Sequence, residues 1–179
     1  MESRAGGQRW LVSWHPPEVE PAGRPHGAAG ACVAGDRLVL ISHDGTHWGF
    51  PAGRPDGDES AEETLRREVW EEACARVETA RLLGHARSEC VAGHEAGLVL
   101  VRSYWRAEVE VLPWRPRFEI AHRRLVPAAE AAGHVRDPDP VGTRIAQRAL
   151  LEAALAAPPD EDDTPPGRPG ARGAPAHDS

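Results

Sequence analysis

The sequence predicts an α+β fold in a single domain, and three observations lead to this prediction. A chain of 179 residues suits one domain with its own core. Its apolar patterns run in the order hairpin, helix, several strands, helix, which differs from a regular βαβ alternation. The formal net charge is −7 and no run of basic residues occurs, so we expect no binding groove for a nucleic-acid polymer.

The first part of the chain is predicted to be an arm followed by a β-hairpin. Residues 1–27 contain a brief apolar–polar alternation at Arg9–Trp14, which is a candidate short strand, and then a loop rich in Pro and Gly. Residues 28–33 and 37–42 are candidate strands, and Ala34-Gly35-Asp36 between them is a plausible hairpin connection. We therefore assign 1–27 to an N-terminal arm and begin the domain at residue 28.

A helix is predicted over 61–73, and extended segments follow it. Residues 77–87 have an extended pattern, and 97–105 form a nearly continuous apolar run suited to a buried strand. Residues 107–112 alternate between apolar and polar types, as a half-buried strand does. A last short strand is predicted over 123–126.

The C-terminal third is predicted to contain a helical turn, a helix and a tail. Residues 128–132 suit a helical turn, and 140–157 suit a helix that begins at Asp139-Pro140 and places apolar residues at helical spacing. From residue 158 to 179, Pro, Gly, Asp and Arg dominate, so this tail is predicted to be disordered. The domain is accordingly expected to span 28–157.

The helix at 61–73 carries an unusual group of carboxylates. Glu68, Glu71 and Glu72 stand at i, i+3 and i+4 and therefore share one face. An apolar stripe at the same period can anchor the neighbouring face (Leu65, Val69, Ala73). Like charges on one face destabilise an isolated helix, so a hard divalent cation is the obvious candidate to balance them.

The carboxylates and the loop before them resemble a known motif. The chain reads Gly53-x5-Glu59-x7-Arg67-Glu68-Val69-x-Glu71-Glu72-x-Cys74-Ala75, which resembles the box of the Nudix (MutT-like) hydrolase family. Every specified position agrees except one: Cys74 stands where the family has Gly. The preceding Trp48-Gly-Phe-Pro51 is similar to the aromatic and proline segment that commonly precedes this box. The resemblance covers roughly residues 28–130.

This resemblance implies a fold and a reaction class. The implied fold is an α/β/α sandwich with a mixed β-sheet. The implied reaction is divalent-metal-dependent hydrolysis of a nucleoside diphosphate linked to another moiety, by water attack on phosphorus, with a nucleotide-type small molecule as substrate. Mg²⁺ is the expected ion, with Mn²⁺ as an alternative, because Mg²⁺ prefers hard oxygen ligands and keeps several waters. The alternative function is a catalytically silent Nudix-fold domain that binds and senses nucleotides.

The resemblance also assigns residues to roles. The expected metal ligands are the carboxylates of Glu68, Glu71 and Glu72 and the carbonyl of Gly53, where Gly lets the backbone approach an ion closely. Glu59 and Arg67 match positions that orient the loop and the carboxylates, and we expect a salt bridge between them. Arg67 as a solvated surface residue is the alternative.

The expected catalytic carboxylates are Glu71, Glu72 and Glu119. Family members often recruit another Glu from a later loop as base or extra ligand, and Glu119 lies just before the last predicted strand. An ordinary loop carboxylate is an equal reading of Glu119, and Glu89 and Glu95 are rival candidates.

Other residues that could bear chemistry have a plainer alternative. Trp48 and Trp105 could stack a nucleobase, although core packing is the more frequent role of such residues. His43 and His47 flank a turn, but the hard site next to them already accounts for a metal. A non-Gly residue at Cys74 would cost about 1 kcal/mol if the helix ends there in a left-handed conformation. A buried structural thiol is the better reading of Cys74 than a soft metal ligand.

The cellular context is predicted from composition. The three cysteines are odd in number and show no C-x-x-C spacing, which favours a reduced, cytoplasmic chain. No apolar stretch is long enough for a membrane span and no secretory signal pattern is present, so we expect no membrane partner. The sequence is compatible with a homodimer. Nothing outside the box identifies the substrate.

Overall fold

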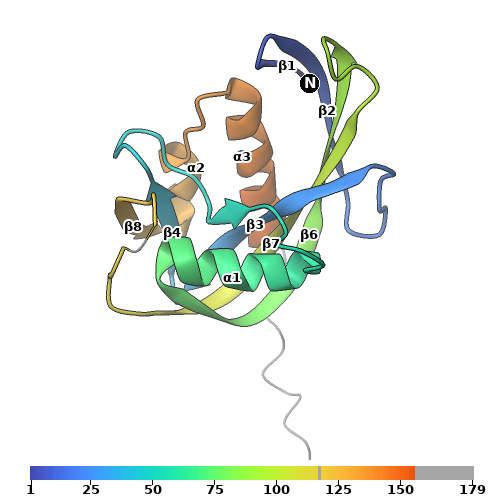
Figure 1. The fold of residues 1–179 in the computed structure, drawn as a ribbon. Coiled ribbons are helices and arrows are strands. Elements are labelled where there is room, and N and C mark those ends of the chain that lie inside the picture. Colours follow the sequence, from blue (N-terminus) through green and yellow to red (C-terminus); the bar gives the residue numbers. More distant parts are fainter. Residues whose placement is uncertain (117, 156–179) are drawn as a thin grey trace, which may run out of the picture.

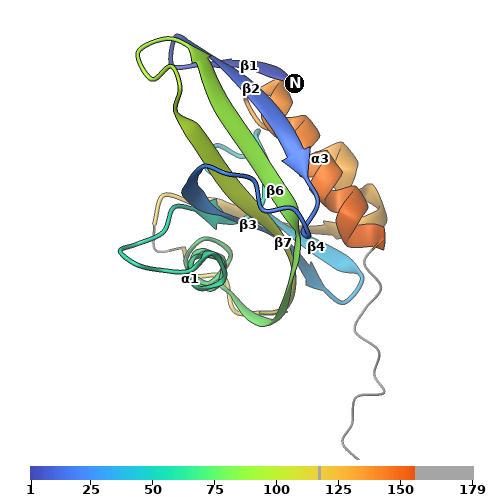
Figure 2. The same cartoon turned by 90° about the vertical axis from the view of Figure 1, so that its right-hand side faces the viewer.

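The computed structural model describes residues 1–116 and 118–155, and it contains one mixed β-sheet between two helical layers (Figures 1 and 2). The strand order is β1-β2-β6-β7-β3-β4-β8, with the short β5 paired to β3. The β3–β7 pair is parallel and the other strand pairs are antiparallel. The strands are β1 Glu2–Ala5, β2 Gln8–His15, β3 Arg24–Ala34, β4 Arg37–Ser42, β5 Ala52–Gly53, β6 Ala75–Ala92, β7 Val99–Val111 and β8 His122–Pro127.

The helices lie on opposite faces of this sheet, which confirms the predicted α/β/α sandwich. Helix α1 (Ala61–Ala73) covers one face, whereas the short α2 (Ala131–His134) and α3 (Pro140–Leu155) cover the other (Figure 2). A 3₁₀ turn at Ala128–Glu130 precedes α2. The predicted hairpin, the helix at 61–73, the last short strand and the C-terminal helical elements are all present near their expected positions.

The core has two halves because strand side chains alternate between the faces. On β4, Val39 and Ile41 pack towards Leu65 and Val69 of α1, while Leu38 and Leu40 pack into the cluster that contains Ala149 of α3. Burial on both faces explains why Leu38–Ile41 is a continuous apolar run instead of an alternating one. The acidic helix α1 is therefore held by its apolar stripe, and its carboxylates lie on the other faces of the helix.

The segment expected to be an N-terminal arm contributes strands to the sheet. The predicted short strand at Arg9–Trp14 lies within β2, which pairs with β6 from Arg9 to His15, and β1 pairs with β2. Strand β3 also begins at Arg24, before the predicted boundary at residue 28. The Pro- and Gly-rich composition concealed this start, because β3 accommodates Pro25 and Gly27 at a register shift in its pairing with β7.

Two further expectations about the strands were wrong in detail. The predicted strands at 97–105 and 107–112 are one continuous strand, β7. Its first residues, Val99 to Arg102, are only partly buried, although their apolar run suggested a fully buried strand. The reason is the cavity described below, which Leu100 and Arg102 line. The predicted tail at 158–179 and the last two residues of the predicted helix at 140–157 lie outside the described residues.

The C-terminal end of α1 is fixed by a residue from a distant strand. Arg123 of β8 donates to the carbonyls of Ala73, Cys74 and Leu112, at 2.7, 3.1 and 3.0 Å. Carbonyls at a helix C-terminus lack partners within the helix and carry partial negative charge, so a guanidinium is a suitable cap. Among the described residues, no helix is both long and apolar enough to cross a bilayer.

Candidate active site

The loop before α1 is tied to the helix at its N-terminus. Ser60 accepts a hydrogen bond from the backbone N–H of Glu63 (3.2 Å), and Glu63 accepts one from the N–H of Ser60 (2.8 Å), which together form a capping box. Thr64 is fully buried and donates to the Glu59 carboxylate at 3.2 Å. The Ser60-x-x-Glu63 spacing was not among the predicted features, although it is visible along the chain and fixes where the loop ends and the helix begins.

Arg67 stands at the centre of the acidic group. Its guanidinium donates to Glu59 (2.8 and 3.0 Å), to Glu68 (2.8 Å) and to Glu71 (3.2 Å). It also donates to the backbone carbonyl of Arg54 at 2.7 Å, which fastens the loop to the helix. The expected Glu59–Arg67 salt bridge is thus present, and it is one part of a larger network. These hydrogen bonds lower the pKa of Glu59 to about 2 and raise the pKa of Arg67.

Gly53 lies against the carboxylate of Glu68. A Cβ atom built on Gly53 would stand 1.8 Å from Glu68 Oε1 and 2.1 Å from its Cδ, so a side chain there would displace the Glu68 carboxylate. A Cβ on Gly27 of β3 would in turn meet the carbonyl oxygen of Gly53 at 2.1 Å. Two glycines therefore bring strand β3, the Gly53 carbonyl and the Glu68 carboxylate together. Glu68 is 8% exposed, and its burial raises the pKa of the carboxyl group.

Glu72 lies in the same region but outside the Arg67 network. Its carboxylate accepts a hydrogen bond from the backbone N–H of Ala52 at 2.8 Å, which fixes it beside Gly53. Burial raises the pKa of Glu72 to about 7, the hydrogen bond from Ala52 opposes the shift, and the charges of Glu68, Glu119 and Glu71 add to it. Glu119 is exposed in the loop before β8, and its neighbour Ile120 is buried. The fold thus brings Glu119 close enough to Glu72 for their charges to interact.

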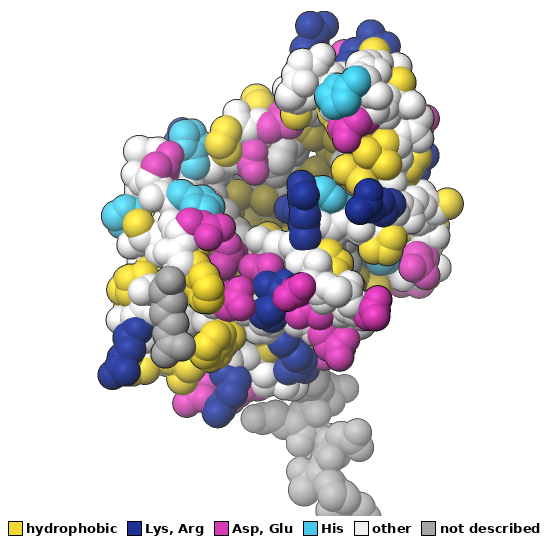
Figure 3. Space-filling view, viewed as in Figure 1, with side chains coloured by type: hydrophobic (Ala, Val, Ile, Leu, Met, Phe, Trp, Pro, Cys, Tyr) yellow, Lys and Arg dark blue, Asp and Glu magenta, His cyan; other side chains and the backbone are white. Residues whose placement is uncertain are grey.

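The arrangement fits a hard cation, although the carboxylates are shared with Arg67. Within the described part of the chain, no group of three or more His, Cys, Asp or Glu side chains converges as a metal cluster. Glu68 and Glu71 are drawn to the Arg67 guanidinium instead. The Gly53 backbone lies close to the Glu68 carboxylate, so carbonyl and carboxylate oxygens are available to one ion. A divalent ion would balance the negative charges around Glu72. Acidic side chains gather on the surface over α1 and its preceding loop (Figure 3).

Cys74 keeps the conformation that Gly would favour. Its φ and ψ are 47° and 53°, the left-handed region, and its N–H bonds back to the carbonyl of Val69. It has the only positive φ of a non-Gly residue in the described chain. The thiol is buried and donates to the carbonyl of Arg115 at 3.3 Å. Helix α1 therefore ends as the family pattern expects, and the thiol serves the structure at this position.

The remaining sequence candidates are placed away from the carboxylates. Trp48 is 8% exposed, packs in the core beneath α3 and donates to the carbonyl of Gly45. Trp105 is half-buried, packs on the α1 side and donates to Ser103. His47 pairs with Asp44 and does not join His43 in a metal pair. Glu89 forms an ion pair with Arg87 at 2.9 Å. Trp48 therefore offers little surface to a nucleobase, whereas Trp105 stays partly exposed.

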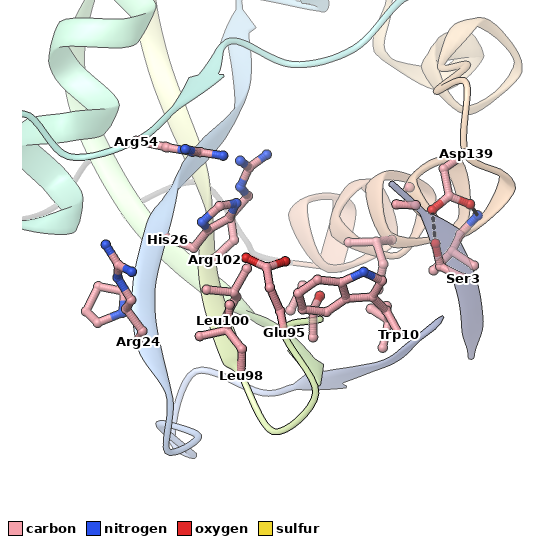
Figure 4. Close-up of a pocket in the computed structure, with 18 of the residues that line it drawn as sticks. Ser3, Trp10, Arg24, His26, Arg54, Glu95, Leu98, Leu100, Arg102 and Asp139 are labelled. Carbon is pink, nitrogen blue, oxygen red and sulfur yellow. Dashed lines mark hydrogen bonds between the residues drawn. The ribbon is translucent and has the colours of Figure 1, made fainter. Parts of the chain in front are cut away.

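A cavity of about 1100 Å³, which the sequence did not predict, opens beside the box. Its walls are the β1–β2 hairpin, the starts of β3 and β7, the loop after β5 and the start of α3. Figure 4 shows Arg54, His26 and Arg102 grouped at one end and Trp10, Leu98 and Leu100 further along. Glu95, a rival for the catalytic role, lines this cavity and is bound to Gln8 at 2.5 Å. No sequence signal marks these residues, because they come from separate segments.

The comparison with protein families decides the identity of the fold. The NUDIX domain profile matches residues 24–145, about two thirds of the chain. The chain belongs to the Nudix family. The matched segment runs from the start of β3 into α3. It contains the network around Arg67 and the cavity residues Arg54 and Arg102.

Similar proteins agree with this assignment. One curated relative is the "Putative 8-oxo-dGTP diphosphatase YtkD" of Bacillus subtilis (strain 168), which is 36% identical over 81 residues. That alignment covers 45% of this chain, and the chain spans about half the length of the relative (48%).

Solved structures show the same fold. The Nudix hydrolase RenU from M. smegmatis matches with a TM-score of 0.58 and 22% identity, over 82% of this chain and 96% of that one. The Bacillus subtilis pyrophosphohydrolase BsRppH matches with a TM-score of 0.53 and 22% identity, over 70% and 77% of the two chains. At this identity the likeness concerns the Nudix fold alone.

Proposed function

We propose that this Nudix protein is a divalent-metal-dependent pyrophosphohydrolase that cleaves a phosphoanhydride bond in a nucleoside diphosphate linked to another moiety. One observation carries the proposal: Arg67 ties Glu59, Glu68 and Glu71 together beside the Gly53 backbone. One guanidinium among three carboxylates leaves a negative charge at this place, and a divalent cation would balance it.

The proposed cofactor is Mg²⁺, with Mn²⁺ as the alternative. Glu68, Glu71, Glu72 and the Gly53 carbonyl would hold it. When bound, a divalent ion supplies an acidified water and screens the charge of a diphosphate. Arg67 would keep the carboxylates of Glu68 and Glu71 in place while the charge around them changes.

The proposed reaction moves one proton and breaks one P–O bond. Water attacks phosphorus, the bridging oxygen leaves with the departing phosphate group, and a carboxylate accepts the proton of the water. We assign this role to Glu119, because it is exposed and its charge acts on Glu72, while Glu72 is anchored to the Ala52 N–H. Glu71 and Glu72 would act through the site that holds the ion.

The supporting experiment compares two substitutions on the same helix. Glu72→Gln should abolish metal-dependent product release while the fold is kept, since Gln can still accept the hydrogen bond from Ala52. Glu62→Gln is the matched control, because the Glu62 side chain lies on α1 at 44% exposure and pairs with Arg66, outside the Arg67 network. The readout is product mass after incubation with Mg²⁺ or Mn²⁺. The panel starts with 8-oxo-dGTP, after the name of the relative, and continues with other nucleoside diphosphate derivatives.

Two outcomes would contradict the proposal. Unchanged turnover in Glu72→Gln would refute the assignment of the site. No release by the wild-type protein across the panel with either metal would favour a Nudix domain that only binds nucleotides.

For the cellular context we infer the reducing cytoplasm, which is supported by three buried free cysteines. A homodimer stays a prediction.

A further inference from the structure

The cavity beside the box contains a cationic corner. Arg24 of β3, Arg54 of the loop after β5 and Arg102 of β7 line it, and we call them the arginine cluster. In Figure 4 the side chains of Arg54 and Arg102 lie together around His26, with Arg24 on the same strand as His26. The space-filling view shows basic and His side chains at the rim of a hollow with a hydrophobic floor (Figure 3). This concentration of positive charge occurs in a chain whose net charge is −7.

The arginine cluster is not neutralised by the protein. None of its three members forms an ion pair with a carboxylate of the described residues. The Nε–H of Arg102 is buried and lacks a hydrogen-bond partner within that part of the chain. Burial and the charges of Arg102, Arg54 and Arg24 lower the pKa of His26 to about 4, which reflects the same positive field. Buried donors without partners are unfavourable, so an anion from outside would stabilise this corner.

The carboxylates that also line the cavity keep their charges, but among the described residues none of them forms an ion pair with the arginine cluster. Glu59 is bound to Arg67, Glu95 is bound to Gln8, and Asp139 accepts hydrogen bonds from Ser3 and from the Val141 N–H. Asp137 accepts from the N–H of Asp139 at 2.8 Å, and Asp58 is exposed on the loop. The guanidinium groups of the cluster therefore remain open to an anion from outside.

The N-terminal hairpin forms one wall of the cavity that contains this corner. Ser3 of β1 donates to Asp139 at the start of α3, and Gln8 of β2 donates to Glu95 in the β6–β7 loop. Glu95 returns a bond from its N–H to Gln8 at 2.9 Å. The hairpin, which precedes the segment matched by the family profile, is therefore fastened on both sides of the cavity. A concave site of this size suits a small molecule.

The cluster is continuous with the box. The Arg54 carbonyl accepts from Arg67, and Arg54 directly follows Gly53, so a ligand at the carboxylates would reach the arginines without leaving the protein surface. Guanidinium groups bind phosphate oxygens in a planar, bidentate manner. We propose that Arg24, Arg54 and Arg102 form an anion subsite that holds a phosphoryl group of the substrate other than the one under attack. The proposal rests on the proposed function and extends it to a substrate class. These substrates carry a phosphoryl group beyond the scissile bond, and that group points away from the carboxylates.

The test measures binding without metal and without turnover. Isothermal titration of inorganic tripolyphosphate into the full chain, in buffer with EDTA, isolates the arginines from the metal site. Arg54→Gln and Arg102→Gln should each weaken binding about tenfold or more, as expected for the loss of hydrogen bonds to a charged group. Arg24→Gln should weaken it as well. Arg37→Gln is the matched control, because Arg37 is exposed on β4 and does not line the cavity, and it should leave the affinity unchanged.

The outcomes separate this proposal from the proposed function. Equal affinities for the wild type, Arg54→Gln and Arg102→Gln would overturn the subsite, and so would the absence of wild-type binding at millimolar tripolyphosphate. Arg24 and Arg54 are exposed, so their variants should unfold at the wild-type temperature and cannot lose affinity through misfolding. Binding that depends on the arginines, combined with no hydrolysis of any nucleotide, would support the subsite and contradict the hydrolase.

Discussion

Gly53→Ala is the substitution that tests most directly how the backbone positions a carboxylate. Gly53 does not have a left-handed φ, so its backbone conformation is open to Ala. What excludes Ala is the Glu68 carboxylate, whose Oε1 would stand 1.8 Å from the new Cβ. Since Glu68 is held by Arg67 at 2.8 Å, the carboxylate can yield only by breaking that bond or by turning away from the loop.

The magnitude follows from this distance. An ordinary contact of about 3.4 Å exceeds the available 1.8 Å by about 1.6 Å, so the carboxylate must move by roughly that amount. A misplacement of about 1 Å in a catalytic arrangement can lower activity about 100-fold. We therefore expect kcat/KM to fall about 100-fold or more. The free energy of unfolding should change by less than about 2 kcal/mol, because only the end of one flexible side chain is displaced.

The assay is product release with Mg²⁺ or Mn²⁺, together with a thermal melt of the same preparation. Gly49→Ala is the matched control, because Gly49 also precedes the box, lacks a left-handed φ and has no atom within 4 Å of a built Cβ. Full activity in Gly53→Ala would refute the reasoning about Glu68. A collapse of the melting temperature would show that the contact supports the fold instead of the site.

Three further predictions concern stability. Mg²⁺ at about ten times its Kd should raise the free energy of unfolding by about 1.4 kcal/mol in the wild type and by less in Glu72→Gln. A melting temperature that does not change with millimolar Mg²⁺ would contradict a preformed site. Cys74→Val should lower the free energy of unfolding in denaturant by about 1–2 kcal/mol, because a β-branched residue is unfavourable at the left-handed φ of 47°. Cys74→Gly should not lower it, and equal free energies for the two variants would contradict backbone strain at this position. The pKa of His26 is lowered to about 4 from its ordinary 6.5, so the unfolded chain binds more protons within this window and stability falls as the pH drops through it. His26→Gln should show a shallower fall of melting temperature with pH, His43→Gln should follow the wild type, and parallel curves for all three proteins would refute the role of His26.

Part of the site could be predicted from spacing alone. The offsets of Glu68, Glu71 and Glu72 placed them on one helix face, and the helix bounds of 61–73 agree with the structure. Such local features depend on a helical period of 3.6 residues and on caps within a few positions, both of which are visible along the chain. The Glu59–Arg67 pair was also expected, but its extension to Glu68, Glu71 and the Arg54 carbonyl required coordinates.

The fold class, the acidic helix and the family pattern of the box can all be recognised along the chain, because they depend on short-range periodicity and fixed offsets. Contacts between distant segments are needed to see that residues 2–15 form a hairpin of the sheet and that this hairpin forms one wall of the cavity lined by Arg54 and Arg102. The same holds for Arg123, which caps a helix about 50 residues earlier in the chain. Contacts of this kind depend on strand order and register, and neither follows from the composition of one segment.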